Sequence, residues 1–181
     1  VKAPKKFGAR RNNAMEILIA GLGLIGGSMA KSLKRAGYIA DGFDRQEVAV
    51  RAVGQGAVRA VASHFSVYHL VFVSLPPDAA MQFIGNGHFK DGAVVADICG
   101  VKGALERFVF EKPRNFRYVG CHPMAGKEVS GFENSCEDLF DGASVVITEN
   151  AQTDKSAVKM LEEIFSQMGC AFVRRCSAEY H

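Results

Sequence analysis

Length, composition and charge indicate one ordinary globular domain and exclude several classes of protein. The chain has 181 residues, of which 48% are hydrophobic and 23% charged, which is material for one sizeable core. No apolar run approaches the ~18–20 residues that cross a bilayer. The five cysteines show no CxxC pair and no metal-ligand spacing, so we expect reduced thiols in a cytoplasmic protein without a metal site or a membrane partner.

The net charge of +3 is concentrated at the start of the chain. Residues 1–14 carry five basic residues and no acidic one, a local charge of +5 that leaves −2 for the rest. This segment has no helical or strand periodicity and only one aromatic residue, Phe7. We therefore expect residues 1–14 to be a disordered basic leader, and we predict no nucleic-acid partner.

Short apolar runs alternate with helical patterns from Met15 onward. The predicted strands cover residues 16–20, 38–43, 57–61 (the weakest), 69–75, 93–98, 117–121, 144–148 and 170–173. The predicted helices cover residues 25–36, 46–53, 79–84, 101–111 and 158–168. This alternation predicts an α/β fold over residues 15–176: a Rossmann-like, doubly wound, mainly parallel sheet with right-handed crossovers.

The first strand is followed by a glycine turn that predicts a dinucleotide site. Gly21, Gly23 and Gly26 fit the pattern G-x-G-x-x-G. The first glycine permits the tight turn, the second lets the backbone approach a pyrophosphate, and the third lets helix and strand pack closely. Leu24 and Ile25 begin the helix, whose free N–H groups favour phosphate.

An acid after the second strand indicates which dinucleotide binds. Asp44 lies 23 residues after Gly21, close to the ~20 expected for a carboxylate that holds the adenosine ribose hydroxyls. A carboxylate there repels a 2′-phosphate, so NAD is the predicted cofactor. The neighbouring Arg45 keeps NADP open as an alternative.

A histidine closes the strand predicted at residues 117–121. In an open α/β sheet, the residue that follows a strand faces the crevice where ligands bind. His122 is therefore the best candidate for a titratable group aimed at the cofactor. Taken alone, the position also fits a structural histidine with a hydrogen bond.

Four segments together resemble one enzyme family. MEILIAGLGLIGGS (15–28), GFDR (42–45), DICGVK (97–102) and CHPMAG (121–126) resemble prephenate dehydrogenase in order and rough spacing. The resemblance covers the chain from Met15 to His181, and its most specific part is the segment around His122. It implies a Rossmann-like domain followed by a helical dimerisation domain, of which residues 177–181 resemble the start. We expect that second domain to be missing here.

The resemblance implies a reaction and a set of site residues. The reaction is NAD-dependent oxidative decarboxylation of prephenate to 4-hydroxyphenylpyruvate in tyrosine biosynthesis, with arogenate as the related alternative substrate. His122 would accept the proton of the ring hydroxyl. Gly100, Gly126, Lys127 and Glu128 would contact substrate, and Ser74, Leu75, Pro76 and Cys99 would border the cofactor.

Two of these residues depart from the family pattern, and other readings stay open. Gly100 stands where the family often has a serine, and Lys127 where it often has a small hydroxyl residue. We expect the full-length protein to be a homodimer through the helical domain, and the 181 residues alone to turn over prephenate poorly. The alternatives are another Rossmann oxidoreductase and a non-catalytic NAD-binding regulatory domain.

Overall fold

The computed structural model describes residues 15–181, so the leader expected over residues 1–14 lies outside the described residues. The strands are β1 (Ile17–Ala20), β2 (Ala40–Phe43), β3 (Leu70–Val73), β4 (Val94–Asp97), β5 (Arg117–Pro123), β6 (Ser144–Thr148) and β7 (Phe172–Cys176). The helices are α1 (Leu24–Arg35), α2 (Gln46–Gly54), α3 (Pro77–Asn86), α4 (Gly103–Phe110) and α5 (Lys155–Gln167), with a 3₁₀ turn η1 (Phe132–Asn134).

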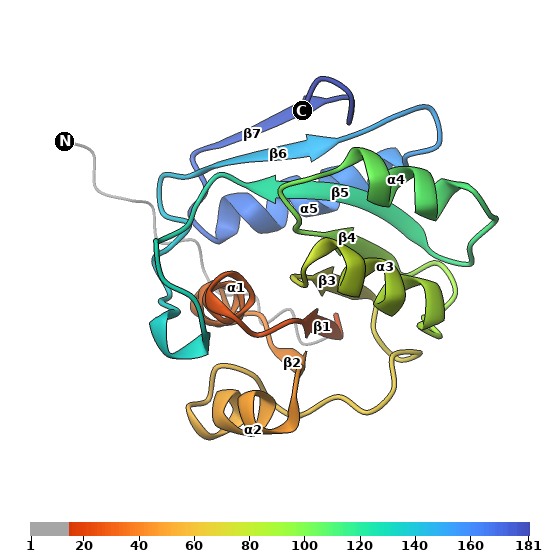
Figure 1. Ribbon diagram of the computed structural model, residues 1–181. Helices are drawn as coiled ribbons and strands as arrows, with labels where there is room; N and C mark the ends of the chain where they lie inside the picture. The colour runs from red at the N-terminus through yellow and green to blue at the C-terminus, as the bar shows by residue number, and fades with distance from the viewer. Residues whose placement is uncertain (1–14) are drawn as a thin grey trace.

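The strands form one twisted sheet in the order β2-β1-β3-β4-β5-β6-β7 (Figure 1). Strands β1 to β5 are parallel, β6 is antiparallel to β5, and β7 is parallel to β6. The chain leaves β1 on one side toward β2 and returns on its other side at β3, which makes this the switch point of the sheet. Ligands of open α/β sheets bind outside the carboxyl ends of the strands at such a point. The predicted Rossmann-like, mainly parallel fold is confirmed.

Alternate residues of each inner strand are buried against opposite layers of helices. Ile17 and Ile19 belong to one hydrophobic cluster with residues of α1, α2 and α5. Leu18, between them, belongs to the other cluster, with residues of α3 and α4. This is the two-sided burial expected of parallel strands, and it explains why their sequences are continuous apolar runs.

The β6–β7 end of the sheet has a different arrangement. Val145 and Ile147 pack into the cluster that includes α5, and Figure 1 shows α5 running along that side of β5, β6 and β7. Val146, which points the other way, is only half-buried. One face of this part of the sheet is therefore open, and it is the face that bears His122, because His122 pairs with Val146.

Two predicted strands are wrong in part. Residues 57–61 form no strand: the segment bends and makes one bridge to β2, between Val61 and Gly42. Backbone hydrogen bonds still join the segment to β2, from Arg59 N to Ala40 O and from Gly42 N to Ala60 O, and the Arg59 side chain forms ion pairs with Asp41 and Glu16. The last strand begins at Phe172 and not at Cys170, because Gly169, with a φ of 102°, and the bond from Cys170 N to Phe165 O still belong to the end of α5.

Candidate functional site

At two of the three glycines in the turn after β1, the backbone lies so close to a carbonyl oxygen that no side chain would fit. Gly21 has a φ of 90°, and a Cβ there would lie 2.2 Å from the carbonyl oxygen of Ser74. A Cβ on Gly26 would lie 1.8 Å from the carbonyl oxygen of Gly21. The fold itself therefore requires these two glycines.

Gly23 is different, because a Cβ added there would meet no protein atom within 4 Å. It precedes α1, whose first N–H groups have no intrahelical acceptor, and no side chain caps the helix. No acidic residue stands in the first turn of α1. The open space, free N–H groups and helix dipole together make a cradle that could hold a pyrophosphate.

A cavity of about 410 Å³ extends from this cradle along the carboxyl ends of the strands. Eight of the predicted site residues line it: Gly23, Leu24, Ile25, Ser74, Leu75, Pro76, Gly126 and Lys127. Ile98, Val129 and Ser130 complete the lining. The structure thus brings six of the eleven predicted cofactor residues together around one cavity, and Gly126 and Lys127 line the same cavity.

Asp44 lies at the end of β2, where its carboxylate is already oriented by the glycine turn. Its Oδ2 accepts a hydrogen bond from the N–H of Leu22 at 2.6 Å, and its Oδ1 accepts one from the N–H of Arg45 at 2.6 Å. The Arg45 guanidinium is exposed and pairs with Glu47 at 3.4 Å. The acid is therefore fixed next to the cradle, while the arginine extends into solvent.

His122 lies in β5 and faces a second cavity of about 770 Å³. Its Nδ1 is 2.9 Å from Nε2 of His181. A Cβ added to Gly100 would lie 3.3 Å from His122 Nε2, so the glycine leaves space beside this nitrogen. The short segments that follow β4 and β5 line both cavities. Ile98 and Gly126 line the first cavity, and Gly100 and Met124 line the second.

The surroundings of His122 favour a neutral imidazole. Partial burial lowers its pKa below the ordinary value of about 6.5, and the nearby His181 and Lys102 lower it further, while Asp97 acts in the opposite direction. A neutral imidazole offers one nitrogen as an acceptor. His122 can therefore act as a base near neutral pH.

Beneath His122 lies a buried polar cluster that the sequence did not assign to the site. The side chains of Lys102 and Asp97 are fully buried and form an ion pair of 2.5 Å. Lys102 Nζ also donates to the carbonyl oxygen of Cys121, and the Tyr118 hydroxyl donates to Asp97 Oδ2. Burial and the Asp97 charge raise the pKa of Tyr118, which keeps it a hydrogen-bond donor. The cluster ties the end of β4, the start of α4 and the backbone next to His122 together.

Two further predicted residues, Cys99 and Glu128, line neither cavity. Cys99 is buried, its Sγ donates to the carbonyl oxygen of Leu75, and burial raises its pKa to about 11. It is therefore a neutral thiol. Glu128 is exposed. Lys127 Nζ lies 3.1 Å from the Sγ of Cys136.

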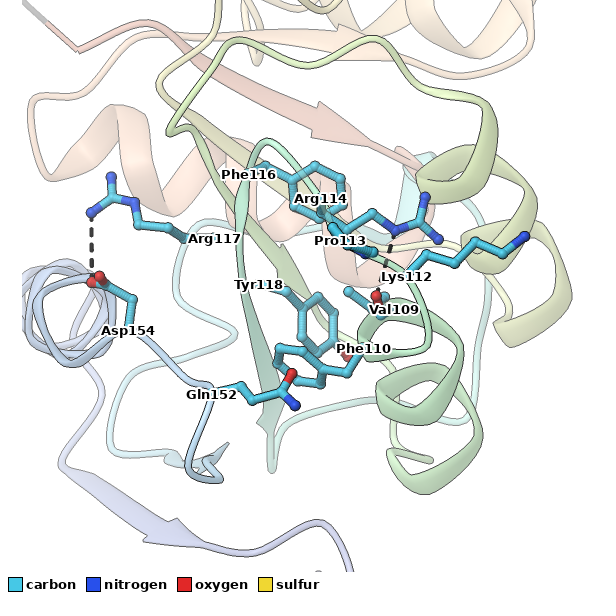
Figure 2. A pocket seen from close by; sticks show the side chains of 10 residues that line it. All are labelled: Val109, Phe110, Lys112, Pro113, Arg114, Phe116, Arg117, Tyr118, Gln152 and Asp154. Atoms are coloured by element: carbon cyan, nitrogen blue, oxygen red, sulfur yellow. Dashed lines mark hydrogen bonds and ion pairs between the residues drawn. The ribbon is translucent and has the colours of Figure 1, made fainter.

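A third cavity, of about 450 Å³, lies at the other end of β5, between the end of α4 and the segment before α5 (Figure 2). It holds basic side chains, but two of them already have partners. Arg117 lies 3.6 Å from Asp154, and Arg114 Nε donates to the carbonyl oxygen of Val109. The sequence signals for a cofactor and a base do not lead to this end of the sheet.

The described residues show neither a metal site nor a membrane-spanning helix. Across residues 15–181, no group of three or more His, Cys, Asp or Glu side chains is placed to hold a metal ion. No helix in the described part of the chain has the length and apolar character to span a bilayer.

Comparison with known proteins identifies relatives with this fold. A family profile described as "Prephenate dehydrogenase, nucleotide-binding domain" matches residues 29–174. A prephenate dehydrogenase from Bacillus subtilis is 29% identical over 175 residues, covering 91% of this chain and 47% of that protein. The chain spans about half the length of these curated relatives: 47% of the protein from Bacillus subtilis and 45% of a prephenate dehydrogenase from Lactococcus lactis.

Two solved structures show the same arrangement. Prephenate dehydrogenase from A. aeolicus, in complex with hydroxyphenyl propionate and NAD⁺, superposes with a TM-score of 0.80 at 30% identity, over 92% of this chain and 61% of that one. Synechocystis arogenate dehydrogenase gives a TM-score of 0.82 at 27% identity, with the same two coverages.

Proposed function

This chain belongs to the prephenate dehydrogenase family, and we propose that it serves the NAD-dependent oxidative decarboxylation of prephenate to 4-hydroxyphenylpyruvate, a step of tyrosine biosynthesis. The observation that carries the proposal is the position of His122. A half-buried imidazole with a lowered pKa lies one short segment away from a crevice formed by the glycine turn.

The crevice fits NAD. The cradle at Gly23 has room for the pyrophosphate, and the N-terminus of α1 offers it hydrogen-bond donors. The Asp44 carboxylate is held where it can accept hydrogen bonds from ribose hydroxyls, and it would repel a 2′-phosphate. When bound, NAD⁺ supplies the hydride acceptor. Ser74, Leu75 and Pro76 at the end of β3 line the wall along which its nicotinamide half would lie.

His122 supplies the base. The hydroxyl-bearing ring carbon of prephenate loses a hydride, and its hydroxyl loses a proton as the carbonyl forms. In the tautomer in which Nδ1 donates its proton to Nε2 of His181, the Nε2 of His122 would take this proton, in the space left open by Gly100. Loss of carbon dioxide from the opposite ring carbon then makes the ring aromatic. A positioned base of this kind accelerates a reaction roughly 10²–10⁴-fold.

Arogenate is the second candidate substrate, because a relative of similar fold is an arogenate dehydrogenase. Prephenate and arogenate share the ring that His122 acts on, and they differ in a keto or amino group on the side chain. The chemistry at His122 is therefore the same for both.

The proposal is tested with both substrates and both cofactors. We expect an increase in absorbance at 340 nm when the chain, in excess over prephenate, is mixed with NAD⁺, and a much smaller one with NADP⁺. Faster reduction with arogenate would assign the second substrate. Because the 181 residues alone are expected to turn over prephenate poorly, binding is measured as well: no binding of prephenate or arogenate to the NAD⁺-saturated chain, with NAD⁺ binding intact, would support a regulatory NAD-binding domain and contradict the proposal.

A further inference from the structure

One face of β5 carries Tyr118, Gly120 and His122 in a row, because alternate residues of a strand point to the same face. The middle position has no side chain. A Cβ added to Gly120 would lie 3.2 Å from Lys102 Cδ and 3.3 Å from Asp97 Oδ2. The side chains of Lys102 and Asp97 therefore fill the space over the glycine, next to the histidine in the row.

Beyond Gly120, β5 loses its neighbour β4. The last pair of the two strands is Asp97 with Gly120, and β5 continues alone on this side. If the parallel ladder went on, the N–H of Cys99 would donate to the carbonyl oxygen of Cys121. Instead, the N–H of Cys99 donates to Asp97 Oδ1, and Lys102 Nζ donates to the Cys121 oxygen. The lysine side chain thus takes the place of a missing backbone donor.

The ammonium group of Lys102 is fully used in this arrangement. Its side chain is completely buried. An ammonium has three protons to donate, and Nζ has three acceptors: the Cys121 carbonyl oxygen, Asp97 Oδ1, and the Asp97 carbonyl oxygen at 3.3 Å. No proton is left for a ligand, so any effect of Lys102 on the reaction acts through the residues that it holds.

We propose that Lys102 is a positioning residue for His122: its ammonium holds the peptide bond from which the histidine projects, and its charge, balanced by Asp97, acts on the imidazole. This inference rests on the proposed function, in which His122 is the base. The nearby ammonium lowers the pKa of His122, and the Asp97 carboxylate raises it. The balance of the two buried charges therefore helps to set the pH range in which the base is neutral.

Other titratable groups also face His122. His181 lies 2.9 Å from it and lowers its pKa as well. The other charged or titratable side chains that line its cavity are Arg174, Arg175, Cys176 and Tyr180. All of these side chains are at least partly exposed, so water and salt screen their charges. The buried ammonium and carboxylate are screened much less, which makes them the constant part of the surroundings of the base.

The charge effect is tested by NMR titration of the His122 imidazole, whose resonances are assigned by comparison with His122→Asn. The variants are Lys102→Met, Asp97→Asn and the double variant, which carries neither charge. We expect the midpoint of Lys102→Met to lie about one pH unit above that of the double variant, because only the carboxylate remains, and that of Asp97→Asn about one pH unit below it. The control Lys155→Met, a change at an exposed lysine, should titrate like the wild type.

The effect on position is measured separately. At a pH well above all the midpoints, His122 is neutral in every variant. Hydride transfer from prephenate to NAD⁺ in a single turnover should still be about 10-fold slower in Lys102→Met than in the wild type, because the Cys121 carbonyl has lost its donor and the base is less well placed. The double variant lacks the same donor and should show the same loss, so it provides this test if a single variant does not fold.

Each outcome supports or overturns the inference. Equal midpoints in the folded variants would overturn the charge effect, and shifts of the same sign in both single variants would overturn it too, since a change of structure would then be the cause. A rate equal to that of the wild type at high pH would overturn the positioning role. Absence of hydride transfer in the wild type would contradict the proposed function, while the NMR titration, which needs no turnover, would still decide whether Lys102 acts on His122.

Discussion

Replacement of Lys102 by methionine tests whether the buried cluster beneath His122 holds the site together. Both side chains of the Lys102–Asp97 pair are fully buried and lie 2.5 Å apart. Removal of one partner of such a pair costs about 3–5 kcal/mol, because the other charge remains in a medium that cannot solvate it. Asp97 retains two donors, the Tyr118 hydroxyl and the N–H of Cys99. We therefore expect the lower end of this range, about 3 kcal/mol.

The assay is urea unfolding followed by circular dichroism, together with a thermal melt. For a domain of this size a loss of about 3 kcal/mol corresponds to a fall in Tm of roughly 6–12 °C. The matched control is Lys155→Met, which removes a lysine whose side chain is 70% exposed and whose pair with Glu149 lies at the surface. That change should cost less than about 1 kcal/mol.

The double variant Asp97→Asn/Lys102→Met completes the cycle. It removes both charges, so it should be more stable than the sum of the two single changes predicts, by an interaction energy of about 1–3 kcal/mol. If Lys102→Met cost no more than Lys155→Met, the cluster would not stabilise the fold, and the reasoning would be refuted.

Three further predictions concern the crevice and the base. Gly23→Ala should leave stability within about 1 kcal/mol of the wild type but weaken NAD⁺ binding, because its Cβ enters the open cradle, whereas Gly26→Ala should destabilise the fold, since its Cβ would lie 1.8 Å from a carbonyl oxygen. Urea unfolding measures the stability of each variant, and NAD⁺ titration measures its affinity. An NAD⁺ affinity of Gly23→Ala equal to that of the wild type would contradict the prediction. Asp44→Asn should reduce the preference for NAD⁺ over NADP⁺, measured as the ratio of the two dissociation constants; an unchanged ratio would remove Asp44 from cofactor selection. Because the pKa of His122 is lowered, its neutral form persists below pH 6.5; the imidazole resonances followed by NMR should therefore titrate below the ordinary value, and a midpoint above it would show that the Asp97 charge dominates.

The sequence was most informative where one residue type alone can meet a steric demand. Gly21 and Gly26 stand at positions where any Cβ would collide with a carbonyl oxygen. The spacing of the glycine turn therefore predicted the turn, the helix after it and the cofactor crevice. The strand that carries His122 could be recognised from its apolar residues, although β5 continues past the predicted end at Cys121 to Pro123, so that His122 lies within it.

The sequence alone could not predict which buried side chains form ion pairs, or to which face of the sheet each residue of β7 points. Lys102 follows Asp97 by five residues, but nothing local shows that both side chains turn inward and meet under β5. The local pattern that could have indicated the Asp97–Lys102 pair was an acid at the end of a strand followed by a lysine before a helix. Arg174 and Arg175 are adjacent and chemically alike, and only the register of β7 on β6 assigns them to opposite faces. Residues 57–61 had a strand-like composition, but they follow β2 with a few backbone hydrogen bonds and one bridge, without forming a strand.

The most direct test of the account is the replacement of His122 by asparagine, which keeps a polar side chain and removes the base. Hydride transfer from prephenate to NAD⁺ is followed at 340 nm in a single turnover, and NAD⁺ affinity is measured in parallel. We predict a fall in rate of roughly 10²-fold or more with an unchanged NAD⁺ dissociation constant. A rate equal to that of the wild type would contradict the assignment of His122 as the proton acceptor.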